Sequence, residues 1–130
     1  MGAILLDTTV LIDALRGRPA GGRLRSLRAA GDTPFTSAIN IEELLRGCHP
    51  GEEAAVALLL DGLRLAVLGR RVAEQAAAWR RTFAAHGTTL SQADCLVAAA
   101  AAGVGARLAT GNVKDFPMPG IVIEHWPVGQ

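Results

Sequence analysis

The sequence predicts an α/β fold, as a single three-layer α/β/α domain with a mainly parallel sheet over residues 1–130. Short apolar runs alternate along the chain with segments of helical period, which is the order that a parallel sheet requires. Half of the residues are hydrophobic and only 4% are aromatic, so aliphatic side chains must form most of the core. A chain of this length buries about two thirds of its unfolded surface, which is enough for a core without disulfides.

The first half of the chain starts with an apolar run without alternation, which is typical of a strand buried on both faces. Apolar residues with helical spacing follow it, and Gly17 and Pro19 end that helix. Thr33 and Pro34 are expected to break the chain before a short strand. The expected elements are strand 3–6, helices 9–15 and 23–30, strand 35–37, and helices 38–47 and 52–60.

The second half repeats the alternation and ends in two strands. Gly87 stands where a helix ending at 86 needs a left-handed residue, and Gly103 closes the alanine-rich helix before it. The expected elements are a strand or extended connector 63–68, helices 71–86 and 91–102, strand 106–109, loop 110–119 and strand 121–124. In the helix at 38–47 one apolar face is predicted, formed by Ile41, Leu44, Leu45 and Cys48.

Composition argues against several classes of protein. Cys48 and Cys95 stand in no CxxC or Cys/His cluster, so neither a disulfide framework nor a zinc site is indicated. The N-terminus lacks a basic segment followed by a signal-length apolar stretch, and residues 96–102 fall far short of the ~20 residues that span a bilayer. We therefore expect a cytoplasmic protein that does not contact membranes.

Charge is distributed unevenly although the net charge is only +1. Five arginines fall in one window without any acid, and such a window can bind phosphates or an acidic partner. It can equally be a solvated helix face, and the sequence leaves both readings open. The candidate contacts to a phosphate-bearing or acidic partner are Arg16, Arg18, Arg23, Arg25 and Arg28.

Carboxylates follow or flank the predicted strands at the edge where ligands bind in parallel α/β sheets. Each has an ordinary alternative role. Asp7 can cap a helix, Asp94 completes a capping box with Ser91, and Asp115 can shape a turn. Jointly, four segments bring a carboxylate to one sheet edge; the candidates are Asp7, Glu42 or Glu43, Asp94 and Asp115.

Carboxylates brought this close repel one another, and a divalent cation removes the conflict. Mg²⁺ prefers oxygen ligands and keeps several waters, so a few carboxylates suffice to hold it. No His or Cys joins the set, which favours Mg²⁺ or Mn²⁺ over Zn²⁺. Such a centre suits phosphodiester hydrolysis with one or two ions.

Four sequence blocks together resemble the PIN domain, and within it the VapC-type toxins of bacterial toxin–antitoxin pairs. They are LLDTTVLIDAL at 5–15, TSAINIEELLRG at 36–47, LSQADCLVAAAA at 90–101, and LATGNVKDF at 108–116 with GIVIEHW at 120–126. The resemblance covers nearly the whole chain. It implies a PIN-like fold and a Mg²⁺- or Mn²⁺-dependent endoribonuclease that hydrolyses RNA phosphodiester bonds.

The resemblance also assigns roles within the site. The acid of the family stands six residues after a Ser and just before a Leu, which selects Glu43 over Glu42, and Asp13 lies inside a helix and not at a strand end. The implied catalytic and metal-binding residues are Asp7, Glu43, Asp94 and Asp115, and the implied supporting residues, which bond the ligands or a phosphate, are Asn112, Thr110, Thr8 and Ser37.

Two residues depart from the family pattern. Asn40 stands where the family usually has Ser or Thr, which can change the orientation of the acids. Gly111 stands where a large residue such as Arg is frequent, which removes a phosphate contact. All four acids are present.

The resemblance implies partners as well. A VapB-like antitoxin would cover the acid site with its C-terminal segment, and a homodimer would form within the toxin–antitoxin complex. Two apolar pairs, Leu11/Leu15 and Leu24/Leu27, are either core or the docking surface of that antitoxin. The alternatives are a PIN-like module that binds RNA or protein without cleavage, a DNase, and a phosphatase with Asp7 as nucleophile. The last resembles the start of haloacid dehalogenases, which need a second Asp two residues after the first, and Thr9 at that position argues against it.

Overall fold

Five strands form one sheet with the order β3-β2-β1-β4-β5, and every neighbouring pair is parallel. The structure is a computed structural model that describes residues 2–128. The strands are β1 (Ala3–Leu6), β2 (Thr33–Ser37), β3 (Arg64–Ala66), β4 (Ala106–Thr110) and β5 (Ile123–His125). The predicted parallel sheet is confirmed.

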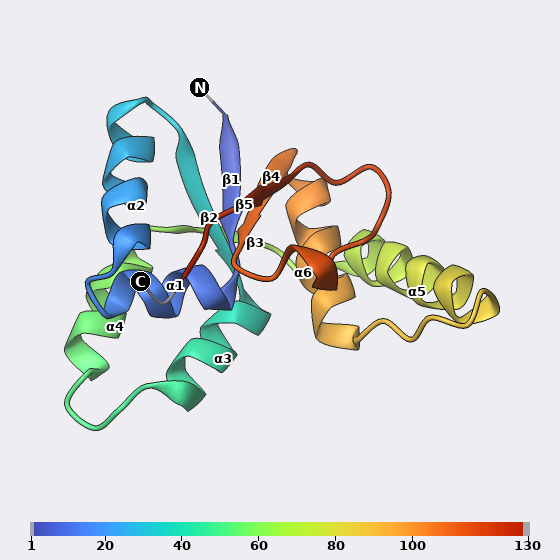
Figure 1. The fold of residues 1–130 in the computed structure, drawn as a ribbon, viewed down its shortest axis with the longest axis horizontal. Coiled ribbons are helices and arrows are strands. Elements are labelled where there is room, and N and C mark those ends of the chain that lie inside the picture. The colour runs from blue at the N-terminus through green and yellow to red at the C-terminus, as the bar shows by residue number, and fades with distance from the viewer. Residues whose placement is uncertain (1, 129–130) are drawn as a thin grey trace.

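Six α-helices and one short 3₁₀ helix occur within residues 2–128 and connect or follow the strands. They lie in two groups on either side of the sheet, with α1, α2 and α4 on one side and α5 and α6 on the other (Figure 1). The three-layer prediction is thus confirmed. The helices are α1 (Thr8–Leu15), α2 (Pro19–Ala29), α3 (Ala38–Gly47), α4 (Glu53–Asp61), α5 (Arg70–Ala85), α6 (Gln92–Gly103) and η1 (Val113–Asp115).

Strand β1 is the centre of the sheet because its side chains are apolar on both faces. Leu5 packs into the core under α5 and α6, whereas Ile4 and Leu6 pack into the core under α1, α2, α3 and α4. All three are fully buried. Side chains alternate along a strand, so an unbroken apolar run serves two cores at once.

Pro34 lies within β2 and not in a break before it, which corrects the prediction. The Thr33 N–H donates to the Gly2 carbonyl on the β1 side, so the nitrogen of Pro34 faces the opposite side of β2. Pairing of β2 with β3 starts only at Phe35. A residue without an N–H is tolerated there because no strand partner needs it.

Two other expectations on apolar residues have different outcomes. Leu45 is 48% exposed, whereas Asn40 and Leu44 are buried, so the inner face of α3 is rotated away from the predicted stripe. For the two pairs left open between core and docking surface, the core alternative holds: Leu11, Leu24 and Leu27 are buried, and Leu15 is half-buried against the same core.

Helix α2 starts at Pro19, four residues before the predicted start. Pro is favoured in the first turn of a helix, where its missing N–H has no intrahelical role. The buried carboxylate of Asp13 accepts a hydrogen bond from the Ala20 N–H at 3.0 Å, so it satisfies one of the open donors of α2. This contact gives Asp13 a structural role.

No helix within residues 2–128 is long and apolar enough to cross a membrane.

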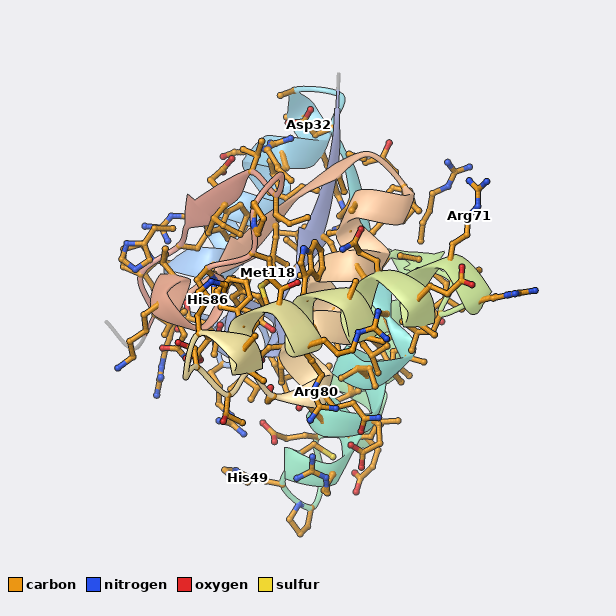
Figure 2. All side chains as sticks on the ribbon, turned by 90° about the vertical axis from the view of Figure 1, so that its right-hand side faces the viewer. Asp32, His49, Arg71, Arg80, His86 and Met118 are labelled. Carbon is orange, nitrogen blue, oxygen red and sulfur yellow. The ribbon has the colours of Figure 1, made fainter. Side chains whose placement is uncertain are left out.

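Arg107 on β4 ties together three segments at the amino end of the sheet. Its Nε donates to Glu124 Oε2 at 2.7 Å, and its Nη2 donates to Asp32 Oδ2 at 3.1 Å. Asp32 also accepts the Gly2 N–H at 2.8 Å. Figure 2 shows Asp32 and His49, just beyond α3, at opposite ends of the molecule, so this cluster is remote from α3.

We expect Arg107→Met to lower the free energy of unfolding by about 1–3 kcal/mol, because two partly buried carboxylates lose a charged donor while the aliphatic stem is kept. Urea denaturation of the purified chain measures this. The matched control is Arg70→Met, whose exposed ion pair with Glu74 should change stability by at most about 0.5 kcal/mol. Equal effects of the two substitutions would contradict the role of the cluster.

Candidate active site

The carboxyl ends of the strands and the first turns of two helices meet at one end of the molecule, the lower end in Figure 1. Asp7 follows β1, and Thr110 ends β4. Glu43 lies on α3, which begins directly after β2, and Asp94 lies in the first turn of α6. Asp115 ends η1, which follows β4. Parallel topology therefore brings side chains from four segments to one edge.

Asp7 is the most buried of the four acids, with 8% of its surface exposed. Asp7 occupies the N-cap position of α1, but its side chain makes no capping hydrogen bond to that helix. Instead, Oδ2 accepts hydrogen bonds from the hydroxyls of Thr110 at 2.8 Å and Thr9 at 3.3 Å. The capping interpretation therefore does not account for where this carboxylate points.

Backbone N–H groups fix the direction of these two hydroxyls. Gly111 N–H donates to Thr9 Oγ1 and Asn112 N–H donates to Thr110 Oγ1, each at 3.0 Å. A hydroxyl has one hydrogen, and an N–H that occupies a lone pair leaves that hydrogen for another acceptor. The acceptor is Asp7 in both cases, so the loop after β4 orients the two hydroxyls that donate to this carboxylate.

A second set of hydrogen bonds links β2 and α3 to the acids. The Ser37 hydroxyl donates to Asn40 Oδ1 at 2.6 Å, and Asn40 Nδ2 donates to Thr8 Oγ1 at 3.0 Å. The Thr8 hydroxyl then donates to Glu43 Oε1 at 2.6 Å. Asn40 Nδ2 also approaches Asp7 Oδ1 at 3.5 Å.

Glu42 and Glu43 are distinguished by these contacts. Glu43 is half-buried and faces Thr8, beside Asp7. Glu42 is exposed and forms an i,i+4 ion pair with Arg46 at 2.9 Å, so it takes part in the surface of α3.

Electrostatics link three of the acids to Asp94. Burial raises the pKa of the Asp94 carboxyl, and the negative charges of Asp115 and Glu43 raise it further. Burial also raises the pKa of Asp7, with a smaller contribution from the charge of Asp94. Hydrogen bonds from the Thr110 hydroxyl, the Thr8 backbone N–H and the Thr9 hydroxyl offset part of the rise at Asp7. Asp94 therefore lies close enough to the other three carboxylates for their charges to act on one another, and at Asp7 and Asp94 the charged form is disfavoured.

The donor set fits a hard divalent cation in type and in charge. All four candidate ligands are carboxylates, and two of them have a raised pKa that a nearby positive charge would reverse. Within residues 2–128, no three His, Cys, Asp or Glu side chains are already arranged to hold an ion together. An ion at this edge would thus bind directly to one or two carboxylates and complete its coordination with waters, or it would draw more of the carboxylates together.

The other predicted supporting residues differ in what they contact. Thr8, Ser37 and Thr110 all take part in the hydrogen bonds around the acids. Asn112 contributes its backbone N–H, and its side chain is exposed.

Three of the five predicted arginine contacts are used within the chain. Arg16 forms two hydrogen bonds with Glu52, whose pKa this contact lowers to about 2. Arg23 donates to the Pro127 carbonyl and lies 5.9 Å from the Trp126 ring, and Arg28 donates to the Gly62 carbonyl. The remaining two, Arg18 and Arg25, are exposed.

Sequence reasoning did not place Thr9 in the site, and it predicted an effect of Asn40 on the orientation of the acids without identifying the partners of its amide. A signal for Asn40 existed, because it lies four residues before Leu44 and so shares the inner face of α3. A polar amide on a buried helix face indicates hydrogen bonds to other elements.

Residues 4–117 match the family model of the PIN domain. The chain belongs to the PIN domain family. It is 32% identical over 115 residues to Ribonuclease VapC19 of Mycobacterium tuberculosis, which covers 88% of this chain and 92% of that protein.

Two solved structures have a similar fold. A chain of the DNA-bound VapBC of Salmonella typhimurium has a TM-score of 0.82 at 26% identity, covering 97% of this chain and 99% of that one. A chain of a toxin–antitoxin complex from Klebsiella pneumoniae has a TM-score of 0.73 at 28% identity, covering 92% and 95%.

The raised pKa of Asp94 predicts a pH-dependent effect of Asp94→Asn on the metal-free chain. A carboxyl whose pKa is higher in the folded than in the unfolded state lowers stability as pH rises through the folded value. Asn does not ionise, so the variant should gain stability relative to the wild type between pH 4 and pH 7. Urea denaturation at both pH values measures this gain.

Asp61→Asn, at the exposed end of α4, is the control for a carboxylate outside the site, and the gain of Asp94→Asn with pH should exceed the gain of this variant. A constant offset between Asp94→Asn and the wild type from pH 4 to pH 7 would contradict the raised pKa of Asp94.

Proposed function

We propose that this chain is a metal-dependent endoribonuclease, acting as one PIN domain and as the toxin of a VapC-type toxin–antitoxin pair. The observation that carries the proposal is the placement of four carboxylates from different segments, Asp7, Glu43, Asp94 and Asp115, at the carboxyl edge of the sheet. Its similarity to Ribonuclease VapC19, over 88% of this chain, supports RNA as the substrate class.

Asp7 and Asp94 are the proposed direct ligands of Mg²⁺ or Mn²⁺, and Glu43 and Asp115 would hold its waters or a second ion. When bound, such an ion stabilises negative charge on the scissile phosphate and lowers the pKa of a water molecule. The raised pKa of Asp7 and Asp94 supports their assignment, since these groups gain most from a cation.

The contacts of Asp7 and Glu43 suggest how the chain prepares the site. The two threonine hydroxyls bond Oδ2 of Asp7, so Oδ1 is the proposed metal-binding oxygen. The hydrogen bond from Thr8 goes to Oε1 of Glu43, and this leaves Oε2 as the proposed acceptor for a proton from the attacking water.

We propose that water attacks phosphorus and that the 3′ oxygen leaves, which breaks the P–O3′ bond, gives a 5′-phosphate and a 3′-hydroxyl, and requires no 2′-hydroxyl. Choice of RNA over DNA therefore depends on how the strand is bound and presented. We propose Arg18 and Arg25 as phosphate or antitoxin contacts, because both are exposed on or next to α2.

We also propose a VapB-like antitoxin that covers the acid site, and a homodimer within the complex. The toxin–antitoxin complex from Klebsiella pneumoniae, which has a similar fold, supports the partner. Light scattering of the purified chain, alone and with its partner, measures both assemblies.

Purified chain, freed from any co-purified partner, should cut a total RNA pool into discrete fragments with Mg²⁺ or Mn²⁺ and leave it intact with EDTA. Asp7→Asn and Asp94→Asn should each lower the rate by at least about 100-fold, because removing even a residue that only supports a metal ligand costs about 10–100-fold. Asp61→Asn should cut at the wild-type rate, since Asp61 is at the end of α4, which supplies none of the proposed metal ligands.

Single-stranded DNA is assayed in parallel. Cleavage of DNA alone would replace the ribonuclease by a DNase. Tight RNA binding without metal-dependent cleavage by the folded wild-type chain would instead favour the binding module.

A further inference from the structure

Asn40 is fully buried, and its side chain lies at the centre of the hydrogen bonds between β2, α1 and α3. A buried amide must find partners for its donors and its acceptor, because leaving them unpaired is costly. Here the two donors of the amide are directed at Asp7 and at Thr8, which in turn bonds Glu43. The contacts that satisfy Asn40 are therefore also contacts that orient these two acids.

The orientation of the amide follows from its surroundings. Oδ1 accepts the Ser37 hydroxyl at 2.6 Å, whereas Nδ2 faces Thr8 and Asp7. Turning the amide over would place its carbonyl oxygen against a carboxylate oxygen of Asp7, which repels it. The charge of Asp7 therefore selects this orientation.

That orientation determines where the Thr8 hydroxyl points. Asn40 Nδ2 occupies a lone pair of Thr8 Oγ1, so the single hydroxyl hydrogen of Thr8 is left to donate to Glu43. Donation therefore runs in one direction, from Ser37 through Asn40 and Thr8 to Glu43, with a long branch from Asn40 to Asp7.

We propose that Asn40 is a positioning residue, whose amide orients Asp7 and the Thr8–Glu43 pair at the same time; the proposal rests on the proposed function. A Ser or Thr hydroxyl at this position has one hydrogen and can donate to only one of these partners. An amide has two N–H hydrogens, so the Asn40 side chain can donate to Thr8 and to Asp7 at once, whereas a hydroxyl could donate to only one of them.

Two substitutions test the proposal with Mn²⁺ alone as the probe. Asn40→Leu keeps the branched shape and removes every donor, and Asn40→Thr keeps one donor. Calorimetric titration should show Mn²⁺ affinity lower by about 10–100-fold in Asn40→Leu and lower by a smaller factor in Asn40→Thr. With RNA, kcat should fall while KM stays within about threefold, because the substrate does not touch the buried amide.

The matched control is Thr36→Val, one residue before Ser37. Thr36 is buried, and within residues 2–128 its Oγ1 is a buried polar atom without a hydrogen-bond partner, so its loss removes no contact to the acids. This variant should bind Mn²⁺ and cut RNA within about twofold of the wild type. Circular dichroism verifies folding, and if Asn40→Leu does not fold, Asn40→Thr decides.

Mn²⁺ affinity within twofold of the wild type in folded Asn40→Thr and Asn40→Leu would overturn the role of Asn40 while leaving the nuclease intact. Equal losses in Asn40→Thr and Thr36→Val would overturn it too, because the effect would then be general repacking. A wild-type chain that neither binds Mn²⁺ nor cuts RNA would overturn the proposed function and this inference together.

Discussion

Repulsion between carboxylates at the carboxyl edge of the sheet is the constraint on which the site depends. Asp94 carries a raised pKa because burial and the charges of Glu43 and Asp115 act together. Asp7 is more buried still. The hydroxyls of Thr110 and Thr9 donate hydrogen bonds to its carboxylate, which an exposed carboxylate would receive from water. Without these donors a buried carboxylate would take up a proton and lose its value as a ligand. The polar residues around the acids are therefore as necessary as the acids.

Parallel topology causes this repulsion and also confines it to one edge of the sheet. Every strand points its carboxyl end to the same edge, so the acids converge there, while the amino ends are available for a different purpose. Arg107 joins Asp32 and Glu124 at that other end. There, unlike charges meet and stabilise the sheet. The fold thus separates a cluster of compensated charge from a cluster of like charge.

Sequence alone predicted the layers and the parallel sheet, because apolar runs and helical periods report directly on burial. It failed where pairing decided the outcome. Pro34 reads as a breaker, yet its nitrogen faces away from β1 and precedes the first residue that pairs with β3. Leu45 fits an apolar stripe, yet Asn40 takes part in the inner face of α3. Asn40 contacts Thr8 and Asp7, which precede it in the sequence by 32 and 33 positions. A local hydrophobic period does not reveal contacts over such separations.

The two departures from the family pattern differ in kind once their contacts are compared. Residue 111 reaches the site through its backbone N–H, which bonds Thr9, so a glycine there keeps that contact. A Cβ added to Gly111 would lie 2.9 Å from Val128, so the segment near the end of the chain takes the space of a larger side chain. Residue 40 instead acts through its side chain, inside the hydrogen bonds that orient two acids. A change at 111 therefore alters what surrounds the site, whereas a change at 40 alters how its charges are held.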